Sequence, residues 1–309
     1  MTSTTFGIGV PAFGNPRLEL DVLDMARSVE DADFDEVWIG DHVALNRDMH
    51  STYPYLSKGV AFFPPDADWY ESTVTASAIL AATTRVGVGI GTMVAALRPP
   101  VLLAKQLATI DRLSSGRIQL AVGVGWLAEE YAALGIPWDE RGKRLDGLID
   151  VLRDCWTGSP AGGNYGPYHL EEGVRTFPIP SSSLRILGGG NSKAAIRRAV
   201  ERCDGWYGAA HVDAESLEML RAVVSQIQSA RPTSERSEQP FDYSLNLAVS
   251  ARQLQEKGSA YLAGYLEQAI TIGIERIVFG FGWASLDQGR DTMGLIREAV
   301  NSVTREEQP

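Results

Sequence analysis

Short apolar runs alternate with longer segments of helical periodicity along most of the chain. The clearest unit spans residues 85–125 and begins with an apolar run, Val86 to Gly91, that suits a buried strand. Apolar residues then recur near a 3.6-residue period over 100–114, which predicts a helix with Gly116 as its left-handed cap. A second apolar run, Ile118 to Val122, closes on Gly123-Val124-Gly125. We interpret this unit as strand–helix–strand with parallel strands.

The same alternation predicts eight strands, each followed by a helix. The expected strands lie near 6–10, 37–39, 86–91, 118–122, 184–187, 205–207, 243–249 and 276–279, and the expected helices near 18–33, 71–82, 100–114, 140–156, 193–202, 214–229, 261–272 and 293–303. This pattern predicts an α/β fold, a (β/α)8 TIM barrel that forms a single domain over 1–309. An open doubly wound sheet is the alternative, but the glycines at 123 and 125 do not form the dinucleotide fingerprint G-x-G-x-x-G.

Two segments interrupt the alternation. Residues 158–183 are rich in Gly and Pro and contain a possible hairpin around Tyr165 to Glu171. We interpret them as an insertion over one end of the barrel. Residues 43–68 form a long loop rich in Pro, Tyr and Phe, and a loop of this length in a compact domain is usually functional or mobile.

Composition narrows the class of protein. The 309 residues are 44% hydrophobic and 22% charged, as in ordinary globular enzymes. A net charge of −11 argues against nucleic acid as a partner, since phosphate binding needs clustered Lys and Arg. No apolar run is long enough to span a bilayer, and no secretory signal is visible at the N-terminus. Cys155 and Cys203 give no disulfide framework. We expect a cytoplasmic protein without a membrane partner.

Asp41-His42 is the first candidate for chemistry, because it follows an expected strand at the carboxyl end, where barrels place their active sites. A carboxylate beside an imidazole can hold one tautomer and favour proton transfer near neutral pH. The alternative is that Asp41 caps the loop and His42 packs against the aromatic segment after it. On these two residues alone, packing is the preferred interpretation.

The turn Gly188-Gly189-Gly190-Asn191-Ser192 lies between an expected strand and a helix. Backbone N–H groups and the positive helix end converge there, as in a phosphate site. The alternative is a flexible turn in which Asn191 or Ser192 only caps the helix. Three consecutive glycines are more than a cap needs, so we favour the anion site. Met93-Val94, just past the third strand, could press on a bound ring, although core packing is the ordinary role of such residues.

Several short motifs together resemble one family. They are Val37-Trp38-Ile39-Gly40-Asp41-His42, Leu97-Arg98-Pro99-Pro100, Ala104-Lys105-Gln106-Leu107-Ala108-Thr109-Ile110-Asp111, Leu113-Ser114, Gly116-Arg117, Gly123-Val124-Gly125-Trp126, Glu129-Glu130, Arg141-Gly142, Arg144-Leu145-Asp146, Gly188-Gly189 and Asp204-Gly205-Trp206. With these motifs the chain resembles the luciferase-like monooxygenase superfamily of flavin- and deazaflavin-dependent (β/α)8 barrels. It is most similar to the branch of coenzyme F420-dependent oxidoreductases.

The resemblance implies where a cofactor would bind. A non-prolyl cis peptide in a bulge of the third strand would contact the back of the flavin-type ring, and it maps to Met93-Val94. Val124 and Gly125 would flank the cofactor side chain, and residues 188–192 would bind its phosphate. The sugar-phosphate dehydrogenase branch has an acidic residue at the position aligned with Trp126. An indole cannot act as that general acid, which argues against sugar-phosphate oxidation.

The resemblance also implies the activity. We expect hydride transfer between coenzyme F420 and a small organic substrate, with His42 handling the proton and Asp41 orienting it. The alternative is a monooxygenase that uses reduced FMN and O2, and a non-catalytic flavin-binding barrel is a distant third. Trp126 and Glu129, with residues 43–70 and 158–183, are expected to line the substrate pocket. We expect no metal, and two copies of the chain are expected to form a homodimer.

Overall fold

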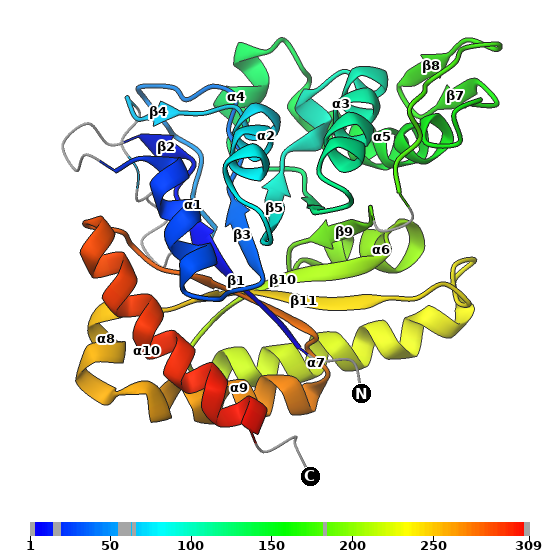
Figure 1. Cartoon of the computed structure of the whole chain (residues 1–309). Coiled ribbons are helices and arrows are strands. Elements are labelled where there is room, and N and C mark those ends of the chain that lie inside the picture. Colours follow the sequence, from blue (N-terminus) through cyan, green and yellow to red (C-terminus); the bar gives the residue numbers. More distant parts are fainter. Residues whose placement is uncertain (1–3, 15–19, 55–62, 64–65, 182–183, 306–309) are drawn as a thin grey trace.

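Eight parallel strands form a closed barrel, which confirms the predicted fold (Figure 1). The computed structural model describes residues 4–14, 20–54, 63, 66–181 and 184–305. The barrel strands are β1 (Thr5–Val10), β3 (Glu36–Ile39), β5 (Gly87–Met93), β6 (Ile118–Val122), β9 (Ile186–Gly189), β10 (Gly205–His211), β11 (Asp242–Ala248) and β12 (Arg276–Gly280). Around the barrel they follow the order β1, β12, β11, β10, β9, β6, β5, β3.

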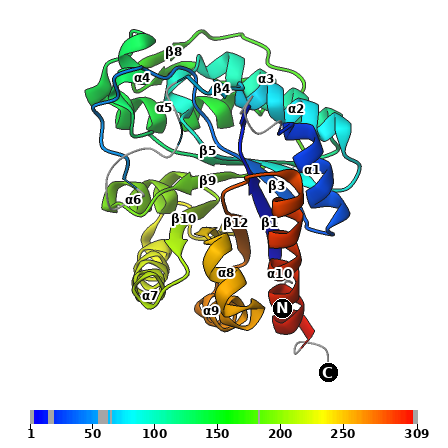
Figure 2. The same cartoon turned by 90° about the vertical axis from the view of Figure 1, so that its left-hand side faces the viewer.

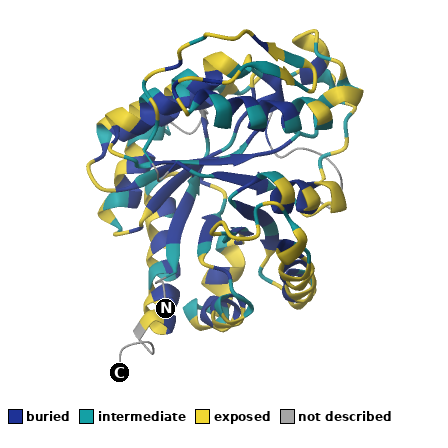
Figure 3. Ribbon diagram, turned by 90° about the vertical axis from the view of Figure 1, so that its right-hand side faces the viewer, coloured by how far each residue is buried: buried dark blue, intermediate teal, exposed yellow. Residues whose placement is uncertain are grey.

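Helices surround the strands. They are α1 (Val22–Asp31), α2 (Ser72–Ala82), α3 (Pro100–Leu113), α4 (Ala128–Ala133), α5 (Arg141–Cys155), α6 (Lys193–Arg202), α7 (Ala214–Ala230), α8 (Ala251–Lys257), α9 (Ser259–Ile272) and α10 (Leu286–Arg305), with single turns at η1 (Ala95–Leu97), η2 (Trp138–Glu140) and η3 (Arg231–Thr233). Helices α3 and α5 lie on the opposite side of the strands from α7, α9 and α10 (Figure 2). The helices turn buried faces toward the strands and exposed faces outward (Figure 3).

The interior of the barrel is filled by aromatic side chains that need glycines opposite them. Trp38 stacks on Tyr207 with ring centroids 4.7 Å apart and an interplanar angle of 13°. A Cβ at Gly89 would lie 2.2 Å from the Trp38 indole, and one at Gly91 would lie 2.5 Å from it. The alternating glycines of β5 therefore face the interior, while Val88 and Ile90 lie on its other side, because side chains alternate along a strand.

Most predicted elements are present, with shifted ends. The strand expected at 184–187 is β9, which begins at Ile186 and includes Gly188 and Gly189. Helix α8 was not predicted; only Leu254 is buried on it, so it has no apolar periodicity to detect. Helix α10 begins at Leu286 rather than near 293. Two short strands, β2 (Phe13–Gly14) and β4 (Asp68–Trp69), pair outside the barrel.

The insertion at 158–183 packs against α3 and α5 on the outside of the barrel. Its hairpin, β7 (Gly163–Tyr165) with β8 (Tyr168–Leu170), packs against α5 at the edge of the molecule (Figure 1). Thr176 then donates a hydrogen bond to the carbonyl of Cys155, and Ser181 donates to Asp111 at 3.0 Å. Both contacts lie at the C-terminal ends of helices, which return to the amino ends of the strands. The hairpin instead lies beside the N-terminal half of α5, where the guanidinium of Arg144 is 5.2 Å from the centre of the Tyr168 ring. That the insertion lines the substrate pocket stays a prediction.

Within the described ranges, no helix is both long and apolar enough to cross a membrane.

Candidate active site

The predicted site residues converge at the carboxyl ends of four neighbouring strands. Asp41 and His42 follow β3, Met93 and Val94 end β5 and begin the next turn, residues 123–126 follow β6, and Gly188 and Gly189 end β9. Strands β9, β6, β5 and β3 are consecutive around the barrel. The structure therefore brings together groups that are far apart in the sequence.

Asp41 does not orient His42, so this prediction is wrong. Its carboxylate is completely buried and accepts two hydrogen bonds from Arg98, at 2.6 and 2.8 Å, and one from the backbone N–H of Val94 at 2.8 Å. Arg98 also donates to Glu71 at 2.8 Å. Burial alone would lower the pKa of Arg98, but the carboxylates of Asp41 and Glu71 raise it. Asp41 therefore fixes the backbone after β5.

Glu130 is the partner of His42. Its buried carboxylate lies 3.0 Å from Nδ1 of His42 and also accepts hydrogen bonds from the backbone N–H groups of Val43 and Ala44. An ionised carboxylate only accepts hydrogen bonds, so in the neutral ring Nδ1 carries the proton and Nε2 has the free lone pair. This arrangement prepares Nε2 to accept a proton.

Aromatic rings enclose His42, which is only 7% exposed. The ring centroids of Trp69, Phe63 and Trp126 lie 4.7, 5.4 and 5.8 Å from that of the imidazole. Tyr53 contacts Trp126 edge-on at 5.0 Å. Trp126 thus lies beside His42, and the rings exclude water from the imidazole. The place of Trp126 in a substrate pocket stays a prediction.

Glu129 holds the loop after β3. Its carboxylate accepts hydrogen bonds from the backbone N–H groups of His50 and Ser51, at 2.6 and 3.0 Å, and from the Ser51 hydroxyl at 2.6 Å. Burial alone would raise the pKa of Glu129, but the hydrogen bonds from Ser51 and His50 lower it to about 2. Since these donors occupy both carboxylate oxygens, Glu129 contributes to the site through the loop that it holds.

The end of β5 is irregular at the predicted place, but the cis peptide bond joins Gly91 and Thr92 rather than Met93 and Val94. The pairing of β5 with β6 shifts register between Ile90 and Met93. The family resemblance places this bond two residues too far along the chain, because the bulge has no side-chain signature of its own. Met93 is buried completely, while its carbonyl accepts a hydrogen bond from the N–H of Gly123 at 2.9 Å.

Glycines let the ends of β6 and β9 approach the bulge closely. A Cβ at Gly123 or Gly189 would lie 2.6 Å from the methyl group of Thr92, and one at Gly125 would lie 2.8 Å from Val94. Gly125 also has a φ of +69°, which favours glycine. Next to it, the hydroxyl of Tyr131 donates to the carbonyl of Val124 at 2.7 Å. Burial raises the pKa of Tyr131, so this donor stays protonated.

The turn after β9 leads into the N-terminus of α6, as in a phosphate site, but the N–H of Gly190 already donates to the carbonyl of Tyr207 at 3.0 Å. A Cβ at Gly188 would lie 2.8 Å from Ala199, and Gly190 has a φ of +108°. Packing and turn geometry therefore explain these glycines without an anion. Ser192 caps α6 by accepting from the N–H of Ala195 at 3.2 Å.

Asn191 fastens this turn to β10, because its side chain donates to the carbonyl of Ala209 and accepts from the N–H of the same residue. The first N–H groups of α6 have no acceptor within the helix. Lys193 is exposed in the first helical turn, where a cation is unfavourable next to the positive helix end. An anion bound at the turn would offset this repulsion.

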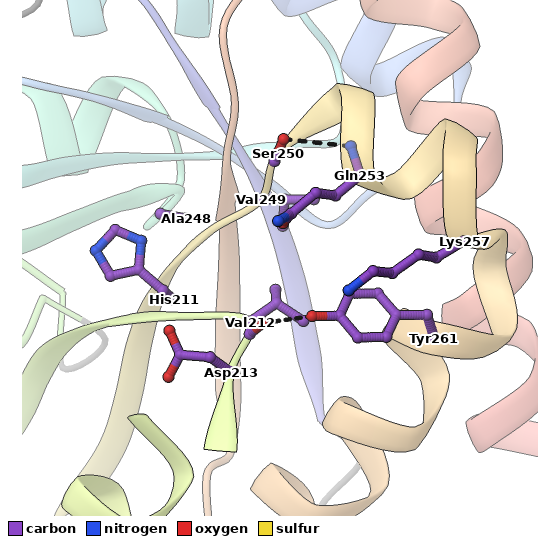
Figure 4. Close-up of a pocket in the computed structure, with 9 residues that line it drawn as sticks. All are labelled: His211, Val212, Asp213, Ala248, Val249, Ser250, Gln253, Lys257 and Tyr261. Atoms are coloured by element: carbon purple, nitrogen blue, oxygen red, sulfur yellow. Dashed lines mark hydrogen bonds between the residues drawn. The ribbon is translucent and has the colours of Figure 1, made fainter. Parts of the chain in front are cut away.

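A pocket of about 560 Å³ opens at the carboxyl ends of β10 and β11 (Figure 4). It was not predicted, because the residues that line it come from five segments with no shared motif. They are His211, Val212, Asp213, Ala248, Val249, Ser250, Gln253, Lys257 and Tyr261.

Comparison with known proteins identifies relatives along most of the chain. The sequence profile of the luciferase-like monooxygenase family matches residues 16–293. An uncharacterised protein of Mycobacterium tuberculosis is 32% identical over 210 residues, which cover 67% of this chain and 70% of that protein. The FMNH(2)-dependent dimethylsulfone monooxygenase of Pseudomonas fluorescens is 32% identical over 231 residues, which cover 72% of this chain and 58% of that enzyme.

Solved structures share the fold at lower identity. The monooxygenase RslO1 of Streptomyces bottropensis superimposes with a TM-score of 0.70 at 18% identity, over 96% of this chain and 99% of that one. An F420-dependent secondary alcohol dehydrogenase superimposes with a TM-score of 0.71 at 16% identity, over 97% of this chain and 99% of that one. At these identities the likeness shows the barrel fold alone.

Proposed function

Because the chain belongs to the luciferase-like monooxygenase family, we propose that it oxidises or reduces a small organic molecule with a bound flavin-type cofactor. The observation that supports this best is the buried His42–Glu130 pair, enclosed by aromatic rings and adjacent to the bulge of β5. A proton-accepting nitrogen beside a dry, ring-lined wall suits a redox reaction in which a proton must also move.

The residues present fit such a cofactor. Val94 and Gly125 would contact its ring and side chain, since the side chain of Val94 lies directly against Gly125. The first turn of α6 with Lys193 would bind its phosphate, since free N–H groups and a cation meet there. A bound flavin would supply the electron-transfer chemistry. The chain itself would hold Val94 in place through Asp41, exclude water with Trp69 and the other rings, and receive the proton at Nε2 of His42.

Reduced FMN is the cofactor that we favour. The relative of known activity that is 32% identical over 231 residues uses FMNH2, whereas the F420-dependent enzymes share only the fold with this chain. Coenzyme F420 is the second candidate, because the motifs around His42 and the turn of α6 resemble that branch. The two cofactors correspond to two reactions, O2-dependent oxygenation and hydride transfer.

Titration of the purified protein with FMN and with F420, followed by fluorescence, tests both candidates. We expect FMN to bind with the lower dissociation constant. Tighter binding of F420, without substrate-dependent O2 uptake in the presence of reduced FMN, would favour the second candidate. Binding of neither cofactor at about 1 mM, the upper end of the KM values of ordinary enzymes, would refute the proposal.

The phosphate position has a separate test. Lys193→Glu should weaken FMN binding about tenfold or more, with little effect on riboflavin, which lacks the phosphate. Lys143→Glu, at an exposed lysine of α5, is the matched control. Equal loss of FMN and riboflavin affinity would place the phosphate elsewhere. Gly189→Asp is unsuitable for this test, because its Cβ would collide with Thr92.

A further inference from the structure

The pocket at the ends of β10 and β11 is next to the candidate active site but separate from it. Its volume of about 560 Å³ is in the range of small-molecule sites. It opens on the carboxyl side of the strands, where barrel enzymes bind their ligands. In Figure 4, the ammonium group of Lys257 and the side chain of Gln253 come from α8 on one wall, while His211 and Asp213 come from the end of β10.

Several acceptors of the pocket already take part in hydrogen bonds within the protein. The carboxylate of Asp213 caps α7 by accepting from the N–H of Ser216 at 2.7 Å. The hydroxyl of Ser250 accepts from the N–H of Gln253 at 3.3 Å. The hydroxyl of Tyr261 donates to the carbonyl of Val212 at 2.6 Å, which fixes the ring. Lys257 and Gln253 supply donors on the wall formed by α8, away from the carboxylate of Asp213 on the other wall (Figure 4).

Lys257 supplies a positive charge that no carboxylate neutralises. Its Nζ lies 4.1 Å from the centre of the Tyr261 ring, and within the described residues it forms no ion pair. The adjacent carboxylate of Glu256 pairs instead with Arg252 at 2.8 Å. In a chain with a net charge of −11, an exposed cation held over a fixed ring in a pocket is a selective point of attraction for anions.

The pocket and the turn proposed for the cofactor phosphate both contact strand β10. Asn191 binds Ala209 at both its N–H and its carbonyl, and His211 follows two residues later on the same strand. A molecule bound at the active site could therefore reach the pocket along the end of β10.

We propose that this pocket binds an anionic group, a carboxylate or a phosphate, of a small organic molecule. Lys257 is the charged contact, and His211 and Gln253 are the polar contacts. The active site would then act on an organic acid. That substrate assignment rests on the proposed function, whereas anion binding in the pocket can be measured without any flavin.

Isothermal titration calorimetry with glutarate as the probe tests the pocket, and glutaramide is its neutral analogue. We expect glutarate to bind the wild type and glutaramide not to bind. Lys257→Gln should weaken glutarate binding about tenfold or more, and Lys257→Arg should keep it within about threefold, because the charge is retained. Lys143→Gln is the control for a lysine outside the pocket. Circular dichroism shows whether each variant is folded.

Repeating the titration with saturating FMN identifies the source of the anion. Unchanged glutarate affinity assigns the pocket to the substrate. Competition by FMN, together with weaker FMN binding by Lys257→Gln, assigns it to the cofactor. If glutarate does not bind the wild type, or binds Lys257→Gln equally well, the anion site is refuted. A protein that binds glutarate but no flavin would keep the pocket and refute the proposed function.

Discussion

His42 and Asp41 are adjacent in the sequence but serve different parts of the site. His42 faces the aromatic rings and pairs with Glu130, whereas Asp41 is buried against Arg98 and the backbone of Val94. His42 can take part in chemistry, whereas Asp41 positions the backbone of Val94, which forms a wall of the site. Substitutions that remove these two contacts should therefore affect different properties, turnover for His42 and stability and flavin binding for the ion pair of Asp41.

We expect His42→Ala to lower turnover by roughly 10²–10⁴-fold on a confirmed substrate, the usual range for a general acid or base. Cofactor affinity should change far less, because the proposed phosphate turn is at α6. Steady-state kinetics and flavin titration measure the two quantities. His169→Ala, at an exposed histidine of the β7–β8 hairpin, is the control. If His42→Ala turns over substrate about as fast as His169→Ala does, His42 only packs against the aromatic rings.

We expect Arg98→Met to lower the free energy of unfolding by about 3–5 kcal/mol, because it leaves the carboxylate of Asp41 buried without a cation. It should also weaken flavin binding, since the same carboxylate holds Val94. Urea unfolding measures the first effect. Arg252→Met, at an arginine that is 87% exposed, should change stability by less than about 0.5 kcal/mol. A similarly small effect of Arg98→Met would contradict the role given to this ion pair.

The sequence indicated the site residues better than their partners. His42 and Glu130 are 88 positions apart, so only the closed barrel shows that they meet. Because Asp41 is next to His42 in the sequence, it was expected to be the partner of His42, but neighbouring residues after a strand need not face the same way. Arg98 and Glu130 were both within the motifs that resemble the family, yet nothing in the sequence distinguished a buried partner from a surface charge.

Helix α4 is the element that joins the aromatic loop to the barrel. Its consecutive residues Glu129 and Glu130 accept hydrogen bonds from His50 and Ser51, and from Val43 and Ala44. The loop is thus held at two points by one short helix. The order of residues 50 and 51 should depend on the ionisation of Glu129.

The pKa of Glu129 is about 2 when the loop is in place, below its ordinary value of 4.5. A lowered folded pKa stabilises the folded state above the ordinary value, and that stabilisation is lost as pH falls from about 4.5 to 2. We expect the amides of His50 and Ser51 to lose protection from hydrogen exchange over this range, measured by mass spectrometry. In Glu129→Gln the protection should be low already at pH 7. Equal protection in both proteins would contradict this contact.

The close approach of β5, β6 and β9 gives a prediction about their packing. Gly189→Ala should lower the free energy of unfolding by about 1–3 kcal/mol, since the new methyl group would overlap that of Thr92. Thr92→Ser removes the overlapping methyl group, so the double variant should recover much of the loss. Gly264→Ala in α9, where a Cβ meets nothing within 4 Å, should be neutral or stabilising. Additive effects of the two substitutions would contradict the contact.

Elements with a regular apolar stripe were predicted well, and those without one were missed. Helix α6 was expected at 193–202 and is found at Lys193–Arg202, because its buried residues follow the helical period. Helix α8 is polar and short, and the start of α10 at Leu286 is polar as well. The course of the insertion depends on contacts with α3 and α5 that periodicity does not encode.

The contacts that stabilise the barrel at the amino ends of its strands are far from the candidate site at the carboxyl ends. At the amino end of the strands, Arg276 binds Glu36 at 3.1 Å and Ser244 at 3.2 Å, and Glu36 accepts from the indole N–H of Trp38 at 2.7 Å. These contacts join β3, β11 and β12 within the barrel. They lie at the opposite end from His42.

We expect Arg276→Met to lower the free energy of unfolding by about 3–5 kcal/mol, as Arg98→Met should, but to leave flavin affinity unchanged. Chemical unfolding and flavin titration of the two variants make the comparison. Equal loss of flavin affinity in both would show that the two ends of the barrel are not independent.

The expected homodimer stays a prediction, which light scattering after size-exclusion chromatography would test.

The way α4 holds the aromatic loop also bears on how substrate choice could diverge among related chains. Glu129 and Glu130 bind the loop largely through backbone N–H groups, those of Val43, Ala44 and His50 among them. Every residue except proline offers the same N–H group, so substitutions along the loop leave these anchors intact. The loop that we expect to line the substrate pocket can therefore change in sequence while its attachment to the barrel is inherited unchanged.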